Sequence, residues 1–548
     1  MPAPFDTTQT RIGDIVDYNA RELSENIALA YYEYGFRQTF SEFQDTCNQV
    51  AKGLMALGVQ RHDHIAMWAN NVPEWIYTQF GSSKMGAVMV TVNTNFKAFE
   101  LEYLLQQSDA TTLILTNGVR EKDEYIRTIQ QVCPEITDCA PGELKSQKAP
   151  HLKNIVHLGT ETIPGMYNWN DMLELGKKIS DTELAARSKS LEPDDVIMMQ
   201  YTSGTTGYPK GVMLSHRNLI GNAQSMAETM ALAPADTLCI PVPLFHCFGC
   251  VIGTMCCMVS GTTMAPVTAF KADVVMEAVD TLKCTALHGV PTMFIAELEE
   301  MEKKAYDTSC LRTGVMAGST CPIEVMNGVI GKMGAEELTI VYGQTESSPG
   351  ITQTRRDDPL NIRTETVGRA LPNVAVKIVD TATGETLPAG ETGELCSRGY
   401  HIMKGYYKMP EKTAEAIDRD GWLHTGDLAS MDEQGNCTIQ GRLKDMIIRG
   451  GENIYPREIE EFLYTHPQIK DAQVVGIPSR KYGEEVAAFI QMKNGNGLSE
   501  EDVRNFCMEN IAYYKIPRFI HFIDEFPTTA SGKIQKFKLR EMAIHDMN

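Results

Sequence analysis

Short β-branched or apolar runs alternate with longer helical patterns between about residues 65 and 338, and this alternation constrains the fold more than any other feature. The strand-like runs are 87–92, 112–115, 196–199 and 339–341, and amphipathic stretches include 101–107 and 273–282. Strands that alternate with helices predict βαβ units and parallel sheets. Ligands bind at the carboxyl ends of such strands. Segments rich in Gly, Ser or Thr follow Met199, Val315 and Val341, so we expect a binding site there.

The pattern changes after about residue 368. Short strand-like pieces at 374–379, 393–396 and 436–439 are separated by turns and predict a small antiparallel β unit. The last hundred residues mix strand patterns at 472–477 and 486–490 with a helix at 503–510, which a capping-box-like start at 499–502 precedes. A chain of 548 residues is too long for one ordinary core. We therefore expect several structural units.

Charge and cysteine usage exclude some classes of function. Lys and Arg number 50 against 71 Asp and Glu, a net charge of -21, which argues against a surface that coats nucleic acid. Residues 1–18 carry three aspartates and no apolar core of a signal peptide, so we expect no secretion signal. The 14 cysteines have irregular spacings. This pattern predicts free thiols in a reducing, cytoplasmic setting.

The stretch 237–270 contains no Asp, Glu, Lys or Arg and is long enough to span a bilayer. Pro241, Pro243 and Pro266 interrupt it, as do three glycines. We interpret it as strand, turn, helix and strand buried in an α/β core, and expect no transmembrane segment. Cys247 and Cys250 match C-x-x-C, but neither a thioredoxin-like context nor a second ligand pair accompanies them. They are interpreted as small buried hydrophobic residues.

Residues 202–210 follow a predicted strand and combine hydroxyls, two glycines and Lys210. Glycines let backbone N–H groups approach an anion closely, and the hydroxyls and lysine add donors and charge. Pro209 precedes Lys210, so the segment is not a Walker A motif. By composition it predicts a polyphosphate cradle, with a Gly/Thr-rich surface loop as the alternative.

Seven further blocks follow this loop in order along the chain. They are Pro243-Leu-Phe-His246, Ala317-Gly-Ser-Thr320, Tyr342-Gly-Gln-Thr-Glu346, Val367-Gly-Arg369, Trp422-Leu-His-Thr-Gly-Asp427, Gly441-Arg-Leu-Lys-Asp445 and Ser531-Gly-Lys533. With Tyr201-Thr-Ser-Gly-Thr-Thr-Gly-Tyr-Pro-Lys-Gly211, they resemble the acyl-adenylate-forming superfamily, which includes acyl-CoA synthetases, peptide-synthetase adenylation domains and beetle luciferases.

The resemblance implies an α/β fold with a large N-terminal AMP-binding domain, residues 1–443, and a mobile α+β C-terminal domain, residues 444–548, that carries the catalytic lysine. The large domain would contain two parallel-sheet subdomains and the small antiparallel β unit. Similar enzymes rotate the small domain between two half-reactions, and their hinge maps to Lys444. Gly450 and Gly451 would then line the channel for coenzyme A, because side chains would obstruct it.

The resemblance also implies an ATP site with Mg²⁺. A carboxylate that attacks the α-phosphate of ATP needs cations and oriented donors, since both reactants are anionic. Mg²⁺ prefers oxygen ligands, and the implied ligands are Thr205 and Glu346. The implied ATP-binding residues are Thr202, Ser203, Gly204, Thr205, Thr206, Gly207, Lys210, Gly318, Ser319, Tyr342, Gly343, Thr345, Asp427, Arg442 and Lys533. Asp427 would accept the ribose hydroxyls, and for Arg442 an ordinary surface ion pair is the alternative.

The implied catalytic residues are Lys533, His246, Glu346 and Thr205. Lys533 would bridge the acyl carboxylate and the α-phosphate as charge builds. His246 would lie beside the acyl carboxylate and the thiol channel. A core histidine satisfied by backbone groups is the alternative for His246.

The neighbourhood 243–251 contains no acid that could hold a substrate amine. The apolar residues expected near the acyl pocket, besides His246, are Val290, Met293, Phe294, Met316 and Val341. They favour an uncharged aliphatic or aryl tail. Segments from 67 to 103 are most similar to medium- and long-chain fatty acyl-CoA synthetases.

Four alternatives to a fatty acyl-CoA synthetase stay open. They are an aryl-acid CoA ligase, an adenylation enzyme that loads a carrier protein, a luciferase-like oxidase and a binding protein without activity. The expected partners are small molecules (a carboxylic acid, ATP and CoA) and no nucleic acid, and a homodimer is one open option for assembly.

Overall fold

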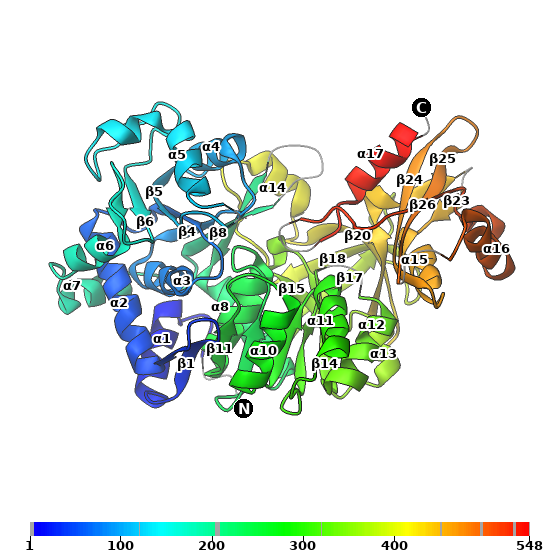
Figure 1. Ribbon diagram of the computed structural model, residues 1–548, viewed down its shortest axis with the longest axis horizontal. Coiled ribbons are helices and arrows are strands. Elements are labelled where there is room, and N and C mark those ends of the chain that lie inside the picture. The colour runs from blue at the N-terminus through cyan, green and yellow to red at the C-terminus, as the bar shows by residue number, and fades with distance from the viewer. Residues whose placement is uncertain are drawn as a thin grey trace.

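The computed structural model describes residues 5–119, 121–202, 209–318, 321–449, 452–493, 497–529 and 533–546. Figure 1 shows the early part of the chain on one side, the middle part at the centre and the C-terminal part on the other side. Four sheets organise these parts, two large and two small.

The first large sheet has the strand order β19-β9-β8-β4-β3-β5-β6-β7 among the described residues. Its strands are β3 (His64–Trp68), β4 (Val88–Thr91), β5 (Ala110–Leu115), β6 (Asn154–His157), β7 (Tyr167–Asn168), β8 (Val196–Thr202), β9 (Lys210–Ser215) and β19 (Gly405–Tyr406). Strands β3 to β8 pair in parallel, whereas β9 and β19 add an antiparallel edge.

The second large sheet has the order β16-β15-β14-β13-β12-β10-β11-β1-β2. Its strands are β1 (Ile27–Tyr31), β2 (Phe36–Thr39), β10 (Thr237–Ile240), β11 (Thr263–Pro266), β12 (Ala286–Gly289), β13 (Thr313–Met316), β14 (Glu337–Gly343), β15 (Gly350–Gln353) and β16 (Arg369–Ala370). The six neighbouring strands β14, β13, β12, β10, β11 and β1 pair in parallel. At the two edges of the sheet, β2, β15 and β16 pair antiparallel. The alternating pattern between residues 65 and 338 is thus confirmed as parallel-sheet architecture.

Helices cover both faces of the two large sheets. They are α1 (Ile12–Glu22), α2 (Phe40–Ala56), α3 (Pro73–Met85), α4 (Ala98–Gln107), α5 (Glu124–Val132), α6 (Trp169–Gly176), α7 (Asp181–Lys189), α8 (His216–Thr229), α9 (Cys256–Ser260), α10 (Ala272–Leu282), α11 (Pro291–Lys303), α12 (Ile323–Gly328), α13 (Leu360–Glu365) and α14 (Pro410–Ala416). Short turns of other helix types are η1 (Pro134–Asp138), η2 (Phe248–Met255), η3 (Val329–Met333) and η4 (Thr345–Ser347). Local sequence sets their ends: α3 starts with Pro73 and stops at Gly86, which adopts the left-handed conformation.

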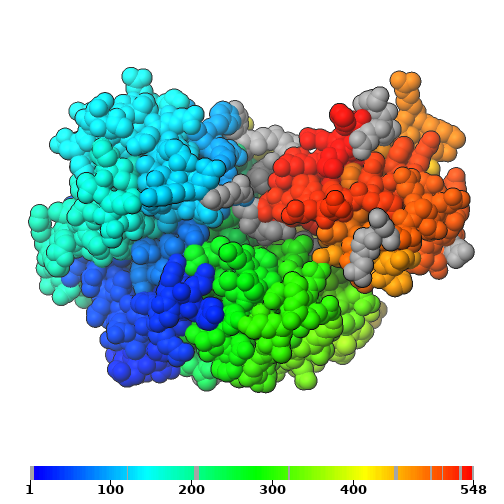
Figure 2. Space-filling model, viewed as in Figure 1, coloured from blue at the N-terminus to red at the C-terminus, as the bar shows by residue number. Residues whose placement is uncertain are grey.

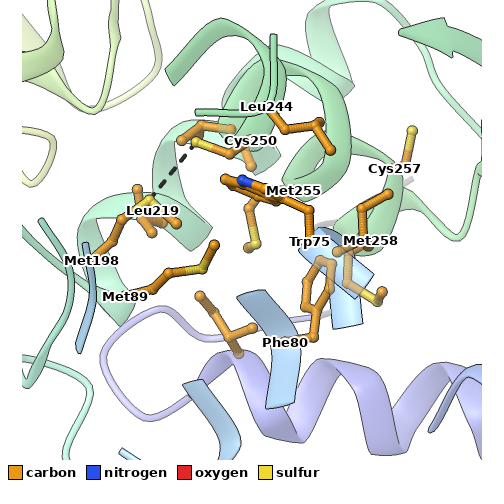
Figure 3. Packing of buried hydrophobic residues seen from close by; sticks show 14 of the residues in the cluster. Trp75, Phe80, Met89, Met198, Leu219, Leu244, Cys250, Met255, Cys257 and Met258 are labelled. Atoms are coloured by element: carbon orange, nitrogen blue, oxygen red, sulfur yellow. Dashed lines mark hydrogen bonds between the residues drawn. The ribbon is translucent and has the colours of Figure 1, made fainter. Parts of the chain in front are cut away.

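The main core lies between the two large sheets. Residues 75–85 of α3 are all buried, which is typical of a helix enclosed on every side. The same cluster takes residues from α2, α8, α9 and η2, together with strands of both sheets. Figure 3 shows its sulfur-rich part, with Met89, Met198, Cys250 and Met255 around Trp75. Separate clusters under α4 and α5, and under α10, α11 and α12, cover the outer faces.

The two small sheets follow. The antiparallel sheet β17 (Val374–Val379), β18 (Gly393–Gly399), β20 (Leu423–Met431) and β21 (Cys437–Arg442) confirms the predicted β unit. The C-terminal part combines β22 (Ile447–Arg449), β23 (Glu452–Ile454), β24 (Ile469–Ser479), β25 (Gly483–Met492) and β26 (Phe519–Phe522) with α15 (Pro456–Tyr464), α16 (Glu500–Asn510) and α17 (Lys536–Asp546). Its short turns are η5 (Leu443–Asp445) and η6 (Tyr513–Lys515). Ser499 caps α16 in a capping box with Asp502, as predicted.

The uncharged stretch 237–270 forms β10, η2, α9 and β11, so the predicted succession of strand, turn, helix and strand is confirmed. Within the ranges described above, no helix combines the length and the apolar character that crossing a bilayer requires. Cys247 and Cys250 are buried free thiols, as are most of the other cysteines.

Candidate active site

The predicted phosphate loop connects β8 and β9, which pair antiparallel with Thr202 opposite Lys210. Ser203, Gly204, Thr205, Thr206 and Gly207 lie outside the described residues, and Ser319, Gly450 and Gly451 do too. The hydroxyl oxygen of Thr202 is shielded from solvent and finds no hydrogen-bond partner in the described part of the chain. A buried hydroxyl without a partner is costly. Thr202 is therefore suited to donate to an anion held at this hairpin.

A tyrosine links the two charged residues that were predicted for phosphate and metal binding. The Lys210 ammonium donates to the Tyr406 hydroxyl at 3.0 Å and lies 4.1 Å from the centre of its ring. The Tyr406 hydroxyl donates to Glu346 Oε1 at 2.7 Å. Burial, and then the charge of Glu346, raise the pKa of Tyr406, which keeps its proton. Sequence reasoning missed Tyr406. This residue reaches the site because its strand, β19, pairs with β9, and the sequence gives no local signal of that pairing.

Glu346 fits the role of a ligand for Mg²⁺. It lies in η4 just after β14, is 8% exposed, and its backbone carbonyl accepts from the Met403 N–H at 2.9 Å. A carboxylate oxygen is a hard donor of the kind that Mg²⁺ prefers. The other predicted ligand, Thr205, lies outside the described residues.

Two glycines shape the predicted adenine slot at the adjacent carboxyl ends of β13 and β14. Gly318 has φ +91°, a backbone conformation that residues other than glycine rarely adopt, and a Cβ there would lie 3.0 Å from the Val290 side chain. A Cβ on Gly343 would collide with the carbonyl oxygen of Pro349. Backbone can therefore line a flat slot at this edge, with Tyr342 beside it.

Asp427 and Arg442 face each other on neighbouring strands of the small antiparallel sheet. Arg442 Nε lies 3.5 Å from Asp427 Oδ1, and the Tyr342 hydroxyl donates to Asp427 Oδ2 at 2.7 Å. Burial raises the pKa of Asp427, while Arg442 and Tyr342 oppose that rise. The Asp–Arg pair is thus tied to the predicted nucleotide slot through Tyr342 and is more than an isolated surface pair.

Lys533 brings the C-terminal part to this group. Its side chain stays open to solvent, yet the protein around it removes enough water to lower its pKa to about 8, and the nearby Arg442 and Lys444 cations act in the same direction. The Asp427 and Asp445 carboxylates oppose that shift. Desolvation, followed by the charge of Arg442, also lowers the pKa of Lys444 in η5. Three cations therefore converge where ATP phosphates are expected.

His246 lies close enough to Lys533 for the charge of the lysine to affect its pKa. Burial, and then the charge of Lys533, lower the pKa of His246 to about 4, so the ring is neutral at physiological pH. His246 Nδ1 accepts from the Phe248 N–H at 3.2 Å. This backbone contact is what the core-histidine alternative predicts, but the proximity of Lys533 also places the ring at the candidate site. The neighbouring Cys247 thiol lies 3.7 Å from the Thr345 hydroxyl.

The residues predicted for the acyl pocket divide between two faces of a sheet. Val290, Met293 and Val341 lie in the main core with η2. Phe294 and Met316 belong to a second cluster, separate from these three residues. Side chains alternate along a strand, and Met316 therefore points away from its neighbours Val315 and Ala317.

The C-terminal part rests on the large domain at further points. Arg457 of α15 donates to the carbonyl of Ile439 at 2.8 Å. Lys470 of β24 forms an ion pair with Glu299 of α11. Figure 2 shows the orange and red C-terminal residues against the green and yellow-green part of the chain. These contacts hold the arrangement in which Lys533 reaches Asp427.

Comparison with known proteins identifies the family. The sequence model of the AMP-binding enzyme family matches residues 16–407. The family model of the AMP-binding enzyme C-terminal domain matches residues 458–533. This chain belongs to the AMP-binding enzyme family. The resemblance inferred from the ordered blocks is confirmed.

This AMP-binding enzyme is similar to two named proteins over nearly its whole length. YngI of Bacillus subtilis (strain 168), whose name assigns it provisionally to the acyl-CoA synthetases, is 53% identical over 98% of both chains. The medium-chain acyl-CoA ligase ACSF2, mitochondrial, of Bos taurus is 38% identical over 98% of this chain and 88% of its own. The enzyme is therefore a ligase of the acyl-CoA synthetase group.

A solved structure shares the fold. The crystal structure of the anthranilate CoA ligase AuaEII in complex with anthranoyl-AMP has a TM-score of 0.84 and 27% identity, over 99% of both chains. The predicted fold class, with parallel α/β sheets, small antiparallel sheets and a C-terminal α+β part, is confirmed.

Proposed function

We propose that this AMP-binding enzyme activates a medium- or long-chain fatty acid to acyl-AMP with release of pyrophosphate, and then transfers the acyl group to the thiol of CoA with release of AMP. One observation carries the first step: Lys533 of the C-terminal part lies close enough to Asp427 and Arg442 for their charges to shift its pKa, and close enough to His246 to lower the pKa of that ring. An arrangement of this kind supports chemistry at a carboxylate next to a nucleotide.

The charges of the site support adenylation. The carboxylate and the α-phosphate repel each other, and preorganised cations stabilise the charge that builds as they join. Lys533 and Arg442 would offset this charge, and Lys210 would hold the leaving phosphates. The neutral His246 beside them adds no negative charge that would repel the acid. The Thr202 hydroxyl, which has no partner among the described residues, would donate to a phosphate oxygen.

Mg²⁺ would be held by Glu346 and, by resemblance, by Thr205. The ion would neutralise phosphate charge and keep the pyrophosphate leaving group in place. Tyr406 fixes one oxygen of Glu346 and leaves Lys210 directed to the same place. Loss of the Tyr406 hydroxyl in Tyr406→Phe would therefore weaken binding of ATP rather than of the acid.

The second half-reaction needs the C-terminal domain to rotate, because the CoA thiol attacks from the side that Lys533 occupies. We place the boundary between residues 443 and 444, with Lys444 as the hinge and Gly450 and Gly451 at the CoA channel. In support, Lys444 lies in the short turn η5 that joins the β21 strand of one unit to the β22 strand of the other. A hinge is expected at such an element end.

The apolar residues predicted for the acyl pocket favour an uncharged acyl tail. Met89, Met198, Cys250 and Met255 lie in the cluster that contains Val290, Met293 and Val341. Methionine adapts to ligands of irregular shape, which suits a flexible alkyl chain. The Bos taurus relative carries the name of a medium-chain ligase, whereas the similar crystal structure is of an anthranilate CoA ligase. An aryl acid is therefore the second candidate substrate.

The test separates the two half-reactions. In Lys533→Ala, formation of acyl-AMP should fall by about 10²–10³, the loss expected from removing one transition-state donor. Thioester formation from supplied acyl-AMP should be spared, and Gly451→Leu should show the opposite pattern. Lys538→Ala is the matched control, since Lys538 is an exposed lysine of α17 close to Lys533 in the chain. Equal failure of both variants in both half-reactions would contradict the two-conformation proposal.

The acid is identified by AMP release that depends on both ATP and CoA. A panel from acetate to palmitate, with benzoates and anthranilate, should give the highest kcat/KM for a medium or long alkyl chain. A preference for the benzoates would establish the aryl alternative. Acyl-AMP without transfer to CoA would favour a carrier-loading enzyme, an oxygen-dependent product would favour a luciferase-like oxidase, and absence of AMP with every acid would favour a binding protein.

A further inference from the structure

A cysteine, a histidine and a glutamate meet on one face of the small antiparallel sheet, outside the ATP site. Glu394 and Cys396 are two residues apart on β18, so their side chains project from the same face. Cys396 pairs directly with His424 of β20. One ligand atom from each of the three side chains lies within 4.8 Å of the other two.

We propose that Glu394, Cys396 and His424 form a binding site for a zinc-type divalent cation, separate from the Mg²⁺ and ATP site. The Cys396 Sγ and His424 Nδ1 atoms are 3.5 Å apart. A tetrahedral zinc ion, with bonds of about 2.3 Å to sulfur and about 2.0 Å to nitrogen, separates these two atoms by about 3.5 Å. The separation of these two atoms therefore matches one edge of the coordination tetrahedron.

Glu394 supplies the third ligand after a small movement. Its Oε2 atom lies 2.8 Å from His424 Nδ1, a hydrogen-bond distance. An ion between these atoms needs a separation of about 3.3 Å, so the carboxylate withdraws by roughly half an ångström. The His424 side chain is 34% exposed while Cys396 is fully buried, so solvent can reach the histidine side of the site. A water molecule can complete the tetrahedron there.

Two further groups lie behind these ligands. His424 Nε2, the ring nitrogen that does not face the cysteine, lies 3.7 Å from Asp418 Oδ2. A histidine bound to metal commonly directs its other N–H to a carboxylate. The Gly426 N–H donates to Glu394 Oε1 at 2.9 Å and fixes the orientation of that carboxylate. Both partners leave Nδ1 and Oε2 facing Cys396.

The charges around the site permit a cation. Glu394 and Asp418 supply two negative charges, and a thiolate would add a third. Lys377 is the opposing charge: its ammonium lies 4.4 Å from the centre of the Trp422 ring and lowers the pKa of Cys396. Burial, with the charge of Glu394 next, outweighs it and raises the pKa of Cys396 to about 12. A bound ion takes the place of the thiol proton, which goes to solvent, and His424 would bind the ion through an unprotonated Nδ1.

The ligand types select the ion. A thiolate with an imidazole favours zinc and its spectroscopic substitute cobalt, whereas Mg²⁺ and Ca²⁺ prefer oxygen ligands alone. The site lies next to Gly426-Asp427, so a bound ion would hold the strand that carries the proposed ribose ligand.

The test uses the full chain, freed of metal and without nucleotide, titrated with Co²⁺ alone. We expect one equivalent to bind with the intense visible bands of tetrahedral cobalt and a thiolate-to-cobalt charge-transfer band in the near ultraviolet, and Zn²⁺ should displace it. Cys396→Ser should lose the charge-transfer band. Asp418→Asn keeps an oxygen that can accept from the Asp420 and Trp422 N–H groups. This variant should retain the charge-transfer band and bind Co²⁺ about 10–100-fold more weakly.

Cys310→Ser is the matched control, because Cys310 is an exposed free thiol. It should bind Co²⁺ as the unaltered chain does. Glu394→Gln provides a second variant if Cys396→Ser does not fold, and it should keep the charge-transfer band but bind more weakly. The proposal is overturned if the unaltered chain shows no band, if the band survives Cys396→Ser, or if Cys310→Ser removes it.

Discussion

At the scale of single residues, Lys533 makes the first half-reaction depend on pH. Its pKa is lowered to about 8, chiefly by desolvation and then by Arg442, and only the ammonium form can stabilise developing negative charge. We expect kcat/KM for ATP in acyl-AMP formation to fall as pH rises through about 8, since kcat/KM reports groups of the free enzyme. Bound phosphates favour the ammonium form, so the corresponding fall in kcat should occur at higher pH.

Pre-steady-state measurement of pyrophosphate release between pH 6.5 and 10 checks this dependence. Lys533→Arg serves as the control, because a guanidinium keeps its charge over this range. It should be slower overall and should lack the fall near pH 8. A fall that persists unchanged in Lys533→Arg would show that another group is responsible.

Glu297 gives a second prediction, on stability. It is fully buried on α11, both of its carboxylate oxygens lack a partner among the described residues, and burial alone raises its pKa to about 8. The folded chain therefore holds a proton that the unfolded chain releases above its ordinary pKa of 4.5. Stability must fall as pH rises from about 4.5 to 8, by about 3 kcal/mol between pH 5 and pH 7.5.

Substitution of Glu297 by methionine, which has similar length and no charge, should remove this dependence. Relative to the unaltered chain, Glu297→Met should gain stability as pH increases, and the difference in Tm between pH 5 and pH 8 measures it. Glu297→Gln should be equally insensitive to pH but less stable, because its amide stays unsatisfied. Parallel Tm curves for Glu297→Met and the unaltered chain would contradict the prediction.

At the scale of elements, η2 depends on a close approach that only glycine permits. A Cβ on Gly249 would collide with the carbonyl oxygen of Pro243 and lie 2.8 Å from the Leu244 backbone. Both residues belong to the segment that ends at His246. Gly249→Ala should therefore destabilise the chain by about 1–3 kcal/mol, as overpacking does, and displace His246 enough to reduce kcat.

Gly331 is the matched control for Gly249, since it also lies in a π-helical turn, η3, and a Cβ there would meet nothing within 4 Å. Gly331→Ala should leave activity unchanged and stabilise the chain by up to about 1 kcal/mol through its better helix propensity. Thermal unfolding and kcat of the two variants decide the matter. Equal effects would show that close packing at η2 is unimportant.

Elements were the part of the fold that could be predicted best from sequence. Periodicity placed the strands at 112–115 and 339–341 inside β5 and β14, because buried parallel strands are apolar along their whole length. The pairing of distant strands left no local signal. Tyr406 contacts Lys210 across 196 residues, and it was missed for this reason. The sequence also did not show that Phe294 and Met316 pack in a different cluster from Val290, because chain position alone does not determine the face that a side chain occupies.

At the scale of the whole molecule, the two parts of the chain meet in one of the two arrangements that the proposed function requires. The Lys470–Glu299 ion pair joins β24 to α11 in the arrangement that brings Lys533 to Asp427. Their side chains are 26% and 48% exposed, so the pair is worth at most about 1 kcal/mol and is weakened by salt. A contribution of that size can shift a balance between two domain orientations by about 5-fold.

The charge reversal Glu299→Lys should therefore slow acyl-AMP formation by up to about 5-fold at low ionic strength, while thioester formation from supplied acyl-AMP is unaffected or faster. Reversing the partner as well, in Glu299→Lys with Lys470→Glu, should restore the first rate, because the ion pair re-forms with opposite polarity. If the ion pair only stabilised the fold, the variants would change Tm, and neither half-reaction would be slowed selectively. A double-mutant cycle on both half-reaction rates distinguishes these outcomes, since only a contact specific to one orientation can favour one half-reaction at the expense of the other.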